Sequence, residues 1–337
     1  MSTQWYDDTI NEIVKLLSER KFKECKKITK EKFIKDDVLF KLIEFKSKPK
    51  NNHDAQFALA VCYDYGIGIK KNFDCAFDIY EKLAHKNYDK AQLILGKYYE
   101  DGICMDEDEK LAFEWYKKSA DNGNDEAKYY LALCYEYGKN VEIDLTYAFE
   151  LYELSAKAGI PEAQYAIGLC YEYGKGVIKD LVSALKWYKM SESQGIPLAR
   201  YRLGLFYKHG LGGLEKNTKK AINLLNAVLR NTQCDCNCQN KVDVVNSLIE
   251  IYKIDCKKDV KHMYNLGVCY YTLKDYESAF YCYEEAAYAK YAPAQYALGY
   301  CYKHGIGVKA DKVFIEWYKL ANDQDNELAY SYFNTAV

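Results

Sequence analysis

Three alternating cysteines form the densest group of residues in this chain that could do chemistry. Cys234, Cys236 and Cys238 lie in the segment NTQCDCNCQNK. Thiolates are good ligands for zinc and copper, and thiols with a lowered pKa also take part in redox chemistry. Structural zinc sites mostly use C-x-x-C pairs, however, and not this C-x-C-x-C spacing. We therefore favour a polar loop with no metal or other cofactor, and keep a metal site and a redox-active thiol cluster as alternatives.

The other cysteines are more typical of core residues than of a disulfide framework. The chain has 13 cysteines, an odd number. Five of them recur at one position of a repeated segment: Cys62, Cys134, Cys170, Cys269 and Cys301. None has a second cysteine at a fixed offset, and free cysteine packs as a small buried hydrophobe. The N-terminal sequence MSTQWYDDTINEIV also lacks the basic and apolar regions of a signal peptide. We expect reduced thiols in a cytoplasmic protein.

No arrangement of residues indicates catalysis. The Gly-x-Gly loops at 66–68, 174–176 and 305–307 lack the preceding strand and the following Lys-Ser/Thr of phosphate-binding loops. The sequence contains neither H-E-x-x-H nor G-x-S-x-G. Its five histidines are scattered, and His209 and His304 occupy the same position of the repeated segment. We predict that the chain is not an enzyme.

The glycine loops belong to an internal repeat with a period of 36 residues. Similar segments begin at Ala55, Ala91, Ala127, Ala163 and Ala199, and a later one begins at Ala294. Within one copy, Ala163, Ile167 and Tyr171 fall on one helical face. Gly174 then ends the first helix, and Asp180 is suited to cap a second one. Each copy is predicted to be an antiparallel helix hairpin, and stacked hairpins bury faces that one alone would expose.

The pattern A-x-x-x-L-G-x-x-Y-x-x-G-x-G-V, followed by A-x-x-W-Y-x-x-(S/A)-A, resembles the Sel-1-like repeat, a relative of the tetratricopeptide repeat. Residues 91–120 match it nearly throughout, with Trp115, Tyr116 and Ala120 in the second helix. The resemblance implies an all-α fold, a right-handed α-solenoid of antiparallel helix-hairpin repeats whose first helices line a concave face. It also implies a role in protein–protein interaction.

The pattern divides the chain into five parts. Residues 1–54 are expected to form an N-terminal helical cap and 55–230 five repeats. Residues 231–258 read as an irregular insertion with the cysteine loop and a helix. Two further repeats follow at 259–327, the first of them tetratricopeptide-like, and 328–337 are expected to form a C-terminal capping helix. Atypical ends of this kind cover the last apolar faces of a repeat array.

Charge and hydropathy narrow the class of partner. With 47 Lys and Arg against 49 Asp and Glu, the chain is not a globally basic nucleic-acid binder. No apolar run approaches the ~18 residues that span a bilayer, so no membrane insertion is expected. Residues 55–198 carry 24 Asp and Glu against 16 Lys and Arg, so the regular repeats are acidic.

Two columns of side chains on the first helices form the candidate partner-binding groove. The aromatic column is Phe57, Leu93, Tyr129, Tyr165, Tyr201 and Tyr296. The column seven residues further along is Asp64, Glu100, Glu136, Glu172, Lys208 and Lys303. Seven residues make about two turns, so both columns share one stripe. Tyrosines are enriched at interfaces, and acidic side chains favour a partner with a basic segment. Alternatively, the tyrosines pack internally and the acids maintain solubility.

We predict a non-enzymatic protein–protein interaction scaffold or adaptor that binds a peptide or protein in this acidic, tyrosine-rich groove. One alternative is a metal- or redox-responsive adaptor acting through the cysteine loop. Another, implied by the resemblance to secreted cysteine-rich relatives, is carbohydrate or cell-wall-related binding.

Overall fold

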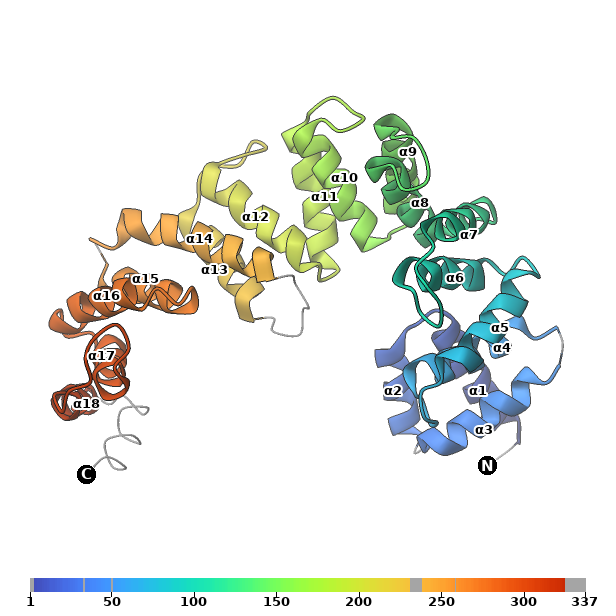
Figure 1. The fold of residues 1–337 in the computed structure, drawn as a ribbon, viewed down its shortest axis with the longest axis horizontal. Helices are drawn as coiled ribbons and strands as arrows, with labels where there is room; N and C mark the ends of the chain where they lie inside the picture. The colour runs from blue at the N-terminus through green and yellow to red at the C-terminus, as the bar shows by residue number, and fades with distance from the viewer. Residues whose placement is uncertain (1–2, 33, 50, 231–237, 258, 325–337) are drawn as a thin grey trace. The chain divides into compact units, whose positions relative to one another are not determined.

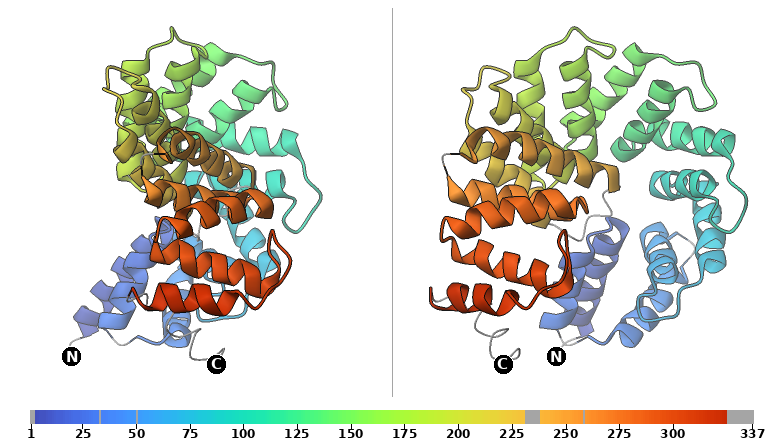
Figure 2. Two further views of the ribbon diagram at one scale, coloured as in Figure 1. Left: turned by 90° about the vertical axis from the view of Figure 1, so that its left-hand side faces the viewer. Right: turned by 60° about the vertical axis from the view of Figure 1, so that its left-hand side comes forward.

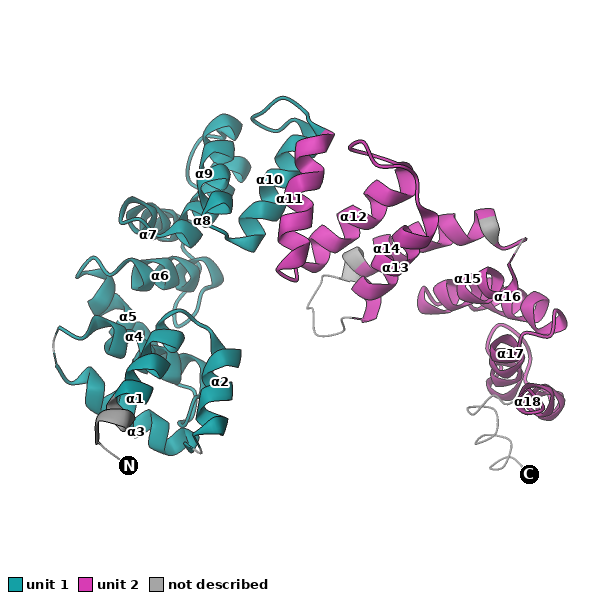
Figure 3. Ribbon diagram, turned by 180° about the vertical axis from the view of Figure 1, so that it is seen from behind, with its two compact units in different colours: residues 1–180 teal, residues 181–337 magenta. Residues whose placement is uncertain are grey.

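The computed structural model describes residues 3–32, 34–49, 51–230, 238–257 and 259–324. These residues form eighteen helices and contain no strand, which confirms the predicted all-α fold (Figure 1). No helix in this part of the chain is long and apolar enough to span a membrane. The chain divides into two compact units, unit 1 over residues 1–180 and unit 2 over residues 181–337 (Figure 3).

The helices of unit 1 are α1 (Thr3–Ser18), α2 (Phe22–Glu31), α3 (Asp36–Ser47), α4 (His53–Tyr65), α5 (Phe73–Ala84), α6 (Asp89–Asp101), α7 (Glu109–Asp121), α8 (Asp125–Tyr137), α9 (Leu145–Lys157) and α10 (Pro161–Tyr173). Those of unit 2 are α11 (Leu181–Ser193), α12 (Pro197–His209), α13 (Thr218–Arg230), α14 (Cys238–Asp255), α15 (Val260–Thr272), α16 (Tyr276–Tyr288), α17 (Ala292–His304) and α18 (Phe314–Asn322).

Consecutive helices within each unit pack side by side (Figure 1 and Figure 2). In unit 1, α4 pairs with α5, α6 with α7 and α8 with α9, and each hairpin packs on the next through its second helix. Helices α1 and α3 pack on α4, so the N-terminal helices cover the first face of the array. In unit 2, α12 pairs with α13, α15 with α16 and α17 with α18, while α14 contacts both α13 and α15. This is the stacking of an α-solenoid.

Local sequence explains where the helices of a hairpin end and begin. Each first helix of unit 1 ends, as predicted, at a glycine in the left-handed conformation: Gly66, Gly102, Gly138 and Gly174. Three second helices begin after a side chain that accepts hydrogen bonds from first-turn N–H groups: Asn72, Asp108 and Asp144. These caps satisfy backbone groups that a helix end would otherwise leave without partners.

The second glycine of the Gly-x-Gly loops has a role that the repeat pattern alone does not indicate. Gly176 has a φ of 67°, and a Cβ atom there would lie 2.0 Å from the carbonyl oxygen of Leu145 at the start of α9. Gly307 approaches Tyr276 at the start of α16 in the same way, and Gly68 approaches Asp36 at the start of the N-terminal helix α3. The loop of one hairpin is therefore seated directly on the backbone of the hairpin before it.

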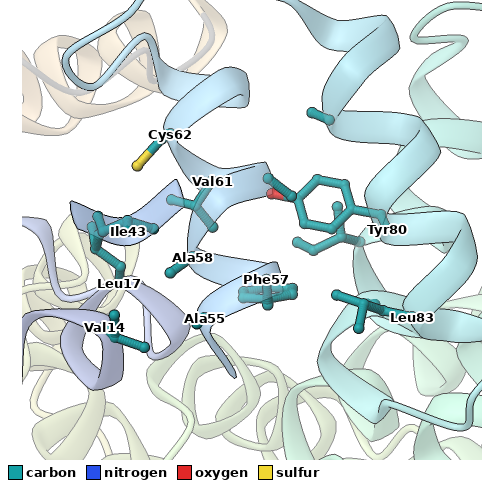
Figure 4. Packing of buried hydrophobic residues seen from close by; sticks show 14 of the residues in the cluster. Val14, Leu17, Ile43, Ala55, Phe57, Ala58, Val61, Cys62, Tyr80 and Leu83 are labelled. Atoms are coloured by element: carbon teal, nitrogen blue, oxygen red, sulfur yellow. The ribbon is translucent and has the colours of Figure 1, made fainter. Parts of the chain in front are cut away.

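The buried core of unit 1 follows the stack of helices. At its start, Leu17 of α1, Phe57 of α4 and Tyr80 of α5 are almost fully buried (Figure 4). Further along, glycine inside a helix permits close contact, because a Cβ atom at Gly96 would lie 2.5 Å from the ring of Tyr116. At Gly96, the small residue after the repeat leucine therefore lets the two helices of the hairpin approach each other, as predicted.

The recurring cysteines are core residues, as predicted. All five are buried: Cys62, Cys134, Cys170, Cys269 and Cys301. Burial raises the pKa of the Cys62 thiol to about 12 and that of the Cys134 thiol to about 11. Both thiols therefore remain protonated and act as small apolar side chains.

Replacing Gly176 with alanine tests the seating of the loop. The new Cβ atom would overlap the Leu145 carbonyl group, so we expect Gly176→Ala to lower the free energy of unfolding by about 3 kcal/mol or more. Gly123→Ala is the matched control, because Gly123 also has a positive φ, of 92°, but nothing lies within 4 Å of its Cβ position. The control should cost about 1 kcal/mol. Urea denaturation followed by circular dichroism measures both, and equal losses would show that the contact with Leu145 is unimportant.

Candidate partner-binding surface

The predicted aromatic column begins inside the protein. Phe57 and Leu93 are only 1% and 3% exposed, and Phe57 packs against Tyr80 with ring centroids 5.3 Å apart. Neither side chain offers much area to a partner, which differs from the predicted open groove. Both line a cavity of about 240 Å³ that is bordered by the turn at residues 18–20. The N-terminal helices, which the repeat pattern does not place, cover this end of the column.

Side-chain contacts hold that N-terminal turn in position. Arg20, between α1 and α2, donates a hydrogen bond to the hydroxyl group of Tyr65 at the end of α4. The Nζ atom of Lys90 on α6 donates to Ser18 Oγ over 3.3 Å. The ring of Phe22 lies 4.6 Å from that of Tyr65. The cap therefore covers α4 and reaches α6.

The rest of the aromatic column packs partly against second helices. Its tyrosines are all half-buried: Tyr129, Tyr165, Tyr201 and Tyr296. The ring of Tyr129 on α8 lies 5.8 Å from that of Tyr152 on α9, and Tyr296 on α17 stacks on Tyr318 of α18 at 5.4 Å. Much of this column therefore contributes to internal packing, which was the alternative left open by the sequence.

The acidic column joins successive hairpins of unit 1. The hydroxyl group of Tyr116 donates to Glu100 Oε2 over 2.6 Å, and Lys139 Nζ donates to Glu100 Oε1 over 2.6 Å. Tyr116 belongs to the same hairpin as Glu100, whereas Lys139 lies in the loop of the next one. Both oxygens of this carboxylate are therefore engaged, and the charge-assisted bonds connect two repeats.

The same arrangement recurs one repeat further along. Glu136 Oε2 accepts from the Tyr152 hydroxyl over 2.7 Å, and Glu136 Oε1 accepts from Lys175 Nζ over 2.6 Å. In the first repeat, the Tyr80 hydroxyl group donates to Asp64 over a longer 3.4 Å. Because loop lysines neutralise Glu100 and Glu136, the column presents less negative charge than its residue types suggest.

These contacts shift the titration of the groups involved. Burial disfavours the charged form of Glu100, but hydrogen bonds from Lys139 and Tyr116 outweigh it, so the pKa of Glu100 is lowered. The hydrogen bond to Glu100 raises the pKa of Lys139. Burial, and then the bond to Glu100, raise the pKa of Tyr116. The site therefore holds an ion pair and a neutral hydroxyl donor at neutral pH.

The ion pair at the corresponding position of unit 2 has the opposite polarity. Lys208 of α12 is buried, and its ammonium group contacts the carboxylate of Glu250 on α14. Lys303, the last member of the column, lies over the ring of Phe314 at 5.7 Å. In unit 2 the column residue Lys208 is the cation, and α14 supplies the carboxylate. In unit 1 the column residue is the carboxylate, and a loop lysine is the cation.

Two exposed tyrosines of unit 1 were not among the candidate residues. Tyr137 and Tyr173 are 62% and 53% exposed, and each directly precedes the glycine that ends α8 or α10. The repeated segment CYEYG carries a signal for them, because the tyrosine before the glycine lies one residue past the acidic column. That offset turns it about 100° away from the acid on the helix.

Part of the predicted chemistry lies outside the described residues. Cys234, Cys236 and the expected capping helix at 328–337 lie outside the described residues. Cys238 begins α14, but its side chain is not described. The metal and redox hypotheses for the cysteine loop therefore stay predictions. In the part of the chain that the structure describes, no three His, Cys, Asp or Glu side chains gather closely enough to hold a metal ion.

Stacked helix hairpins, joined by glycine loops and connected through carboxylates, define an α-solenoid repeat protein. The family model of the Sel1 repeat matches residues 53–88, 89–124, 125–160, 161–196, 197–227, 263–291 and 292–326. These matches cover more than half of the chain, and the protein belongs to the Sel1 repeat family, as the resemblance predicted. Sel1 repeats generally mediate protein–protein interactions.

Solved structures of repeat proteins share this fold. A Sel1 repeat protein from Oxalobacter formigenes is 25% identical, with a TM-score of 0.56 over 66% of this chain and 86% of that one. A protective antigen present in uropathogenic Escherichia coli strains is 24% identical, with a TM-score of 0.53 over 89% of this chain and 67% of that one. A comparison with curated proteins gives no match. The similarity therefore concerns the fold.

The pH dependence of Glu100→Gln tests the linking role of the acidic column. A lowered carboxyl pKa contributes stability above the ordinary value of 4.5, and this contribution disappears as the pH falls. We expect the variant to be less stable than the wild type by about 1 kcal/mol at pH 7. The difference should shrink between pH 5 and pH 3 in urea denaturation.

Glu107→Gln is the matched control, since Glu107 is exposed and forms no ion pair with any described residue. This control should follow the wild-type curve at every pH. A constant stability difference between Glu100→Gln and the wild type across the range would contradict the role of the ion pair.

Proposed function

We propose that this protein is a non-enzymatic scaffold that binds a partner protein through the first helices of unit 1. The contact surface is centred on the exposed side chains of Tyr137 and Tyr173, at the ends of α8 and α10, and extends toward the half-buried Tyr129 and Tyr165 of the predicted column near the starts of the same helices. The observation that carries the proposal is the exposure of two large aromatic side chains at one repeat position. Tyrosine offers broad contact area with a polar tip, which is why interfaces are enriched in it.

Charge near these tyrosines favours a partner segment that contains Lys or Arg. Glu162, at the start of α10, lies on the side of Tyr129 and about 16 Å along the helix from Tyr173; it is exposed and forms no ion pair with any described residue. Asp101, at the end of α6, is also exposed and forms no ion pair with any described residue. Glu136 and Glu172 of the predicted column directly precede the exposed tyrosines but lie about 100° from them around the helix, and Lys175 already contacts Glu136. A basic side chain of the partner that pairs with Glu162 would lie near the ring of Tyr129.

The buried thiols support a scaffold over an enzyme that uses a cysteine nucleophile. Reactive cysteines have a lowered pKa and an accessible sulfur atom. Here burial raises the pKa of the Cys170 and Cys269 thiols to about 12. These side chains serve packing between helices.

Site-specific photo-crosslinking tests the proposed surface. A benzophenone amino acid in place of Tyr137 or Tyr173, in the source cells, should capture the same partner protein at both positions. Position 281 is the matched control, because Tyr281 is also exposed, at 58%, but lies on the second helix α16. For the captured partner, Tyr137→Ala should weaken binding by about 2 kcal/mol, roughly 30-fold.

Two outcomes would contradict the assignment. One is equal capture of the same protein from position 281. The other is unchanged affinity when Tyr137 and Tyr173 are both replaced with alanine. Charge reversal of Glu100 or Glu136 is a poor test, because these acids connect hairpins and their replacement alters the fold itself.

A further inference from the structure

Unit 2 contains a polar pocket that belongs to neither predicted column. Its volume is about 630 Å³, and it lies between α13 and α15, over Tyr252 of α14. Pockets for drug-like molecules are lined mostly by apolar and aromatic side chains. Here Ile222 is the main aliphatic side chain, and most of the lining is charged or carries an amide. The pocket therefore suits a polar ligand.

The rim of the pocket carries an excess of positive charge. It includes Lys219 and Arg230 from α13 and Lys261 from α15, against one acid, Asp259. Asp259 caps α15, where its carboxylate accepts a hydrogen bond from the backbone N–H of Lys261. Among the described residues, none forms an ion pair with any of the three cations. Three positive charges are thus available to a ligand.

The floor of the pocket consists of hydrogen-bonding groups. The hydroxyl group of Tyr252 accepts a hydrogen bond from Asn226 Nδ2 over 3.4 Å, and Asn265 approaches the same hydroxyl from α15. The ring of His262 lies 5.3 Å from that of Tyr252. The amide N–H groups of the lining asparagines that do not contact Tyr252 can donate to a bound oxygen atom. Donors beneath a rim of cations favour carboxylate or phosphate groups.

The spacing of the cations selects an extended ligand. Lys219 and Arg230 are eleven residues apart on α13, which is about 16 Å along the helix axis. A single small anion would not neutralise both ends of such a row. An extended peptide covers the distance with about five residues, and acidic side chains along it would meet the cations in turn.

We propose that this pocket binds an extended acidic peptide segment of a partner protein, with carboxylates placed at Lys219, Lys261 and Arg230. This site prefers an acidic ligand, whereas the surface proposed for unit 1 prefers a basic one. The proposal does not depend on that surface.

Fluorescence anisotropy with a labelled hexaglutamate peptide and the full chain tests this proposal. We expect saturable binding that weakens as salt is added, and no binding of hexalysine or hexaserine. Lys219→Gln combined with Lys261→Gln should weaken binding by about tenfold or more, because charged hydrogen bonds are lost. Asn223→Asp, which adds a negative charge to the exposed part of the lining, should also weaken it.

Lys309→Gln combined with Lys319→Gln is the matched control. It removes the same charge from exposed positions of unit 2 outside the pocket, and its affinity should stay within about twofold of the wild type. Equal weakening in both double variants, or no hexaglutamate binding by the wild type, would overturn the proposal. Tighter binding of a six-nucleotide oligothymidylate, or complete competition by inorganic phosphate at the peptide's concentration, would also overturn it. These results would assign the pocket to nucleic acid or to a small anion.

Discussion

A buried tyrosine hydroxyl group needs a hydrogen-bond acceptor, and much of unit 1 depends on how this need is met. The ring of Tyr116 fills the space that Gly96 leaves between the two helices of a hairpin. Its hydroxyl group then donates to Glu100. A half-buried carboxylate in turn needs a counter-charge, and Lys139 of the following hairpin supplies it. The burial of one tyrosine thus requires an acid near its hydroxyl group and a lysine near that acid, and the lysine connects two repeats.

This dependence explains why a repeated residue type is a poor guide to a binding site in this protein. Glu100 and Glu136 each join their own hairpin to the next one, and that role occupies both oxygens of each carboxylate. Residues one position further along the helix do not take part in these bonds between hairpins. Tyr137 and Tyr173 are exposed at such a position, so their side chains offer contact area to another molecule.

Unit 2 shows that this position of the repeat needs a balanced charge and not an acid in particular. Lys208 occupies the acidic position, and Glu250 of α14 balances it. The same helix places Tyr252 beneath the cations of α13 and α15. An inserted helix therefore both completes the packing and creates a polar pocket that a regular pair of repeats would lack. In a repeat protein of this kind, a segment that interrupts the repeats can create a binding site.

The sequence by itself determined the helix hairpins, their glycine ends and the buried cysteines. These features depend on spacing within one or two helices, and the period of 36 residues repeats that spacing. Only the tertiary structure decided which face of each helix stays open. Phe57 and Leu93 are covered because packing and the turn at 18–20 enclose them, and Glu100 is neutralised by a lysine 39 residues away. The pocket over Tyr252 likewise needs α13, α14 and α15 together. Periodicity defines the face of a helix, but burial and charge on that face depend on neighbours that other parts of the chain contribute.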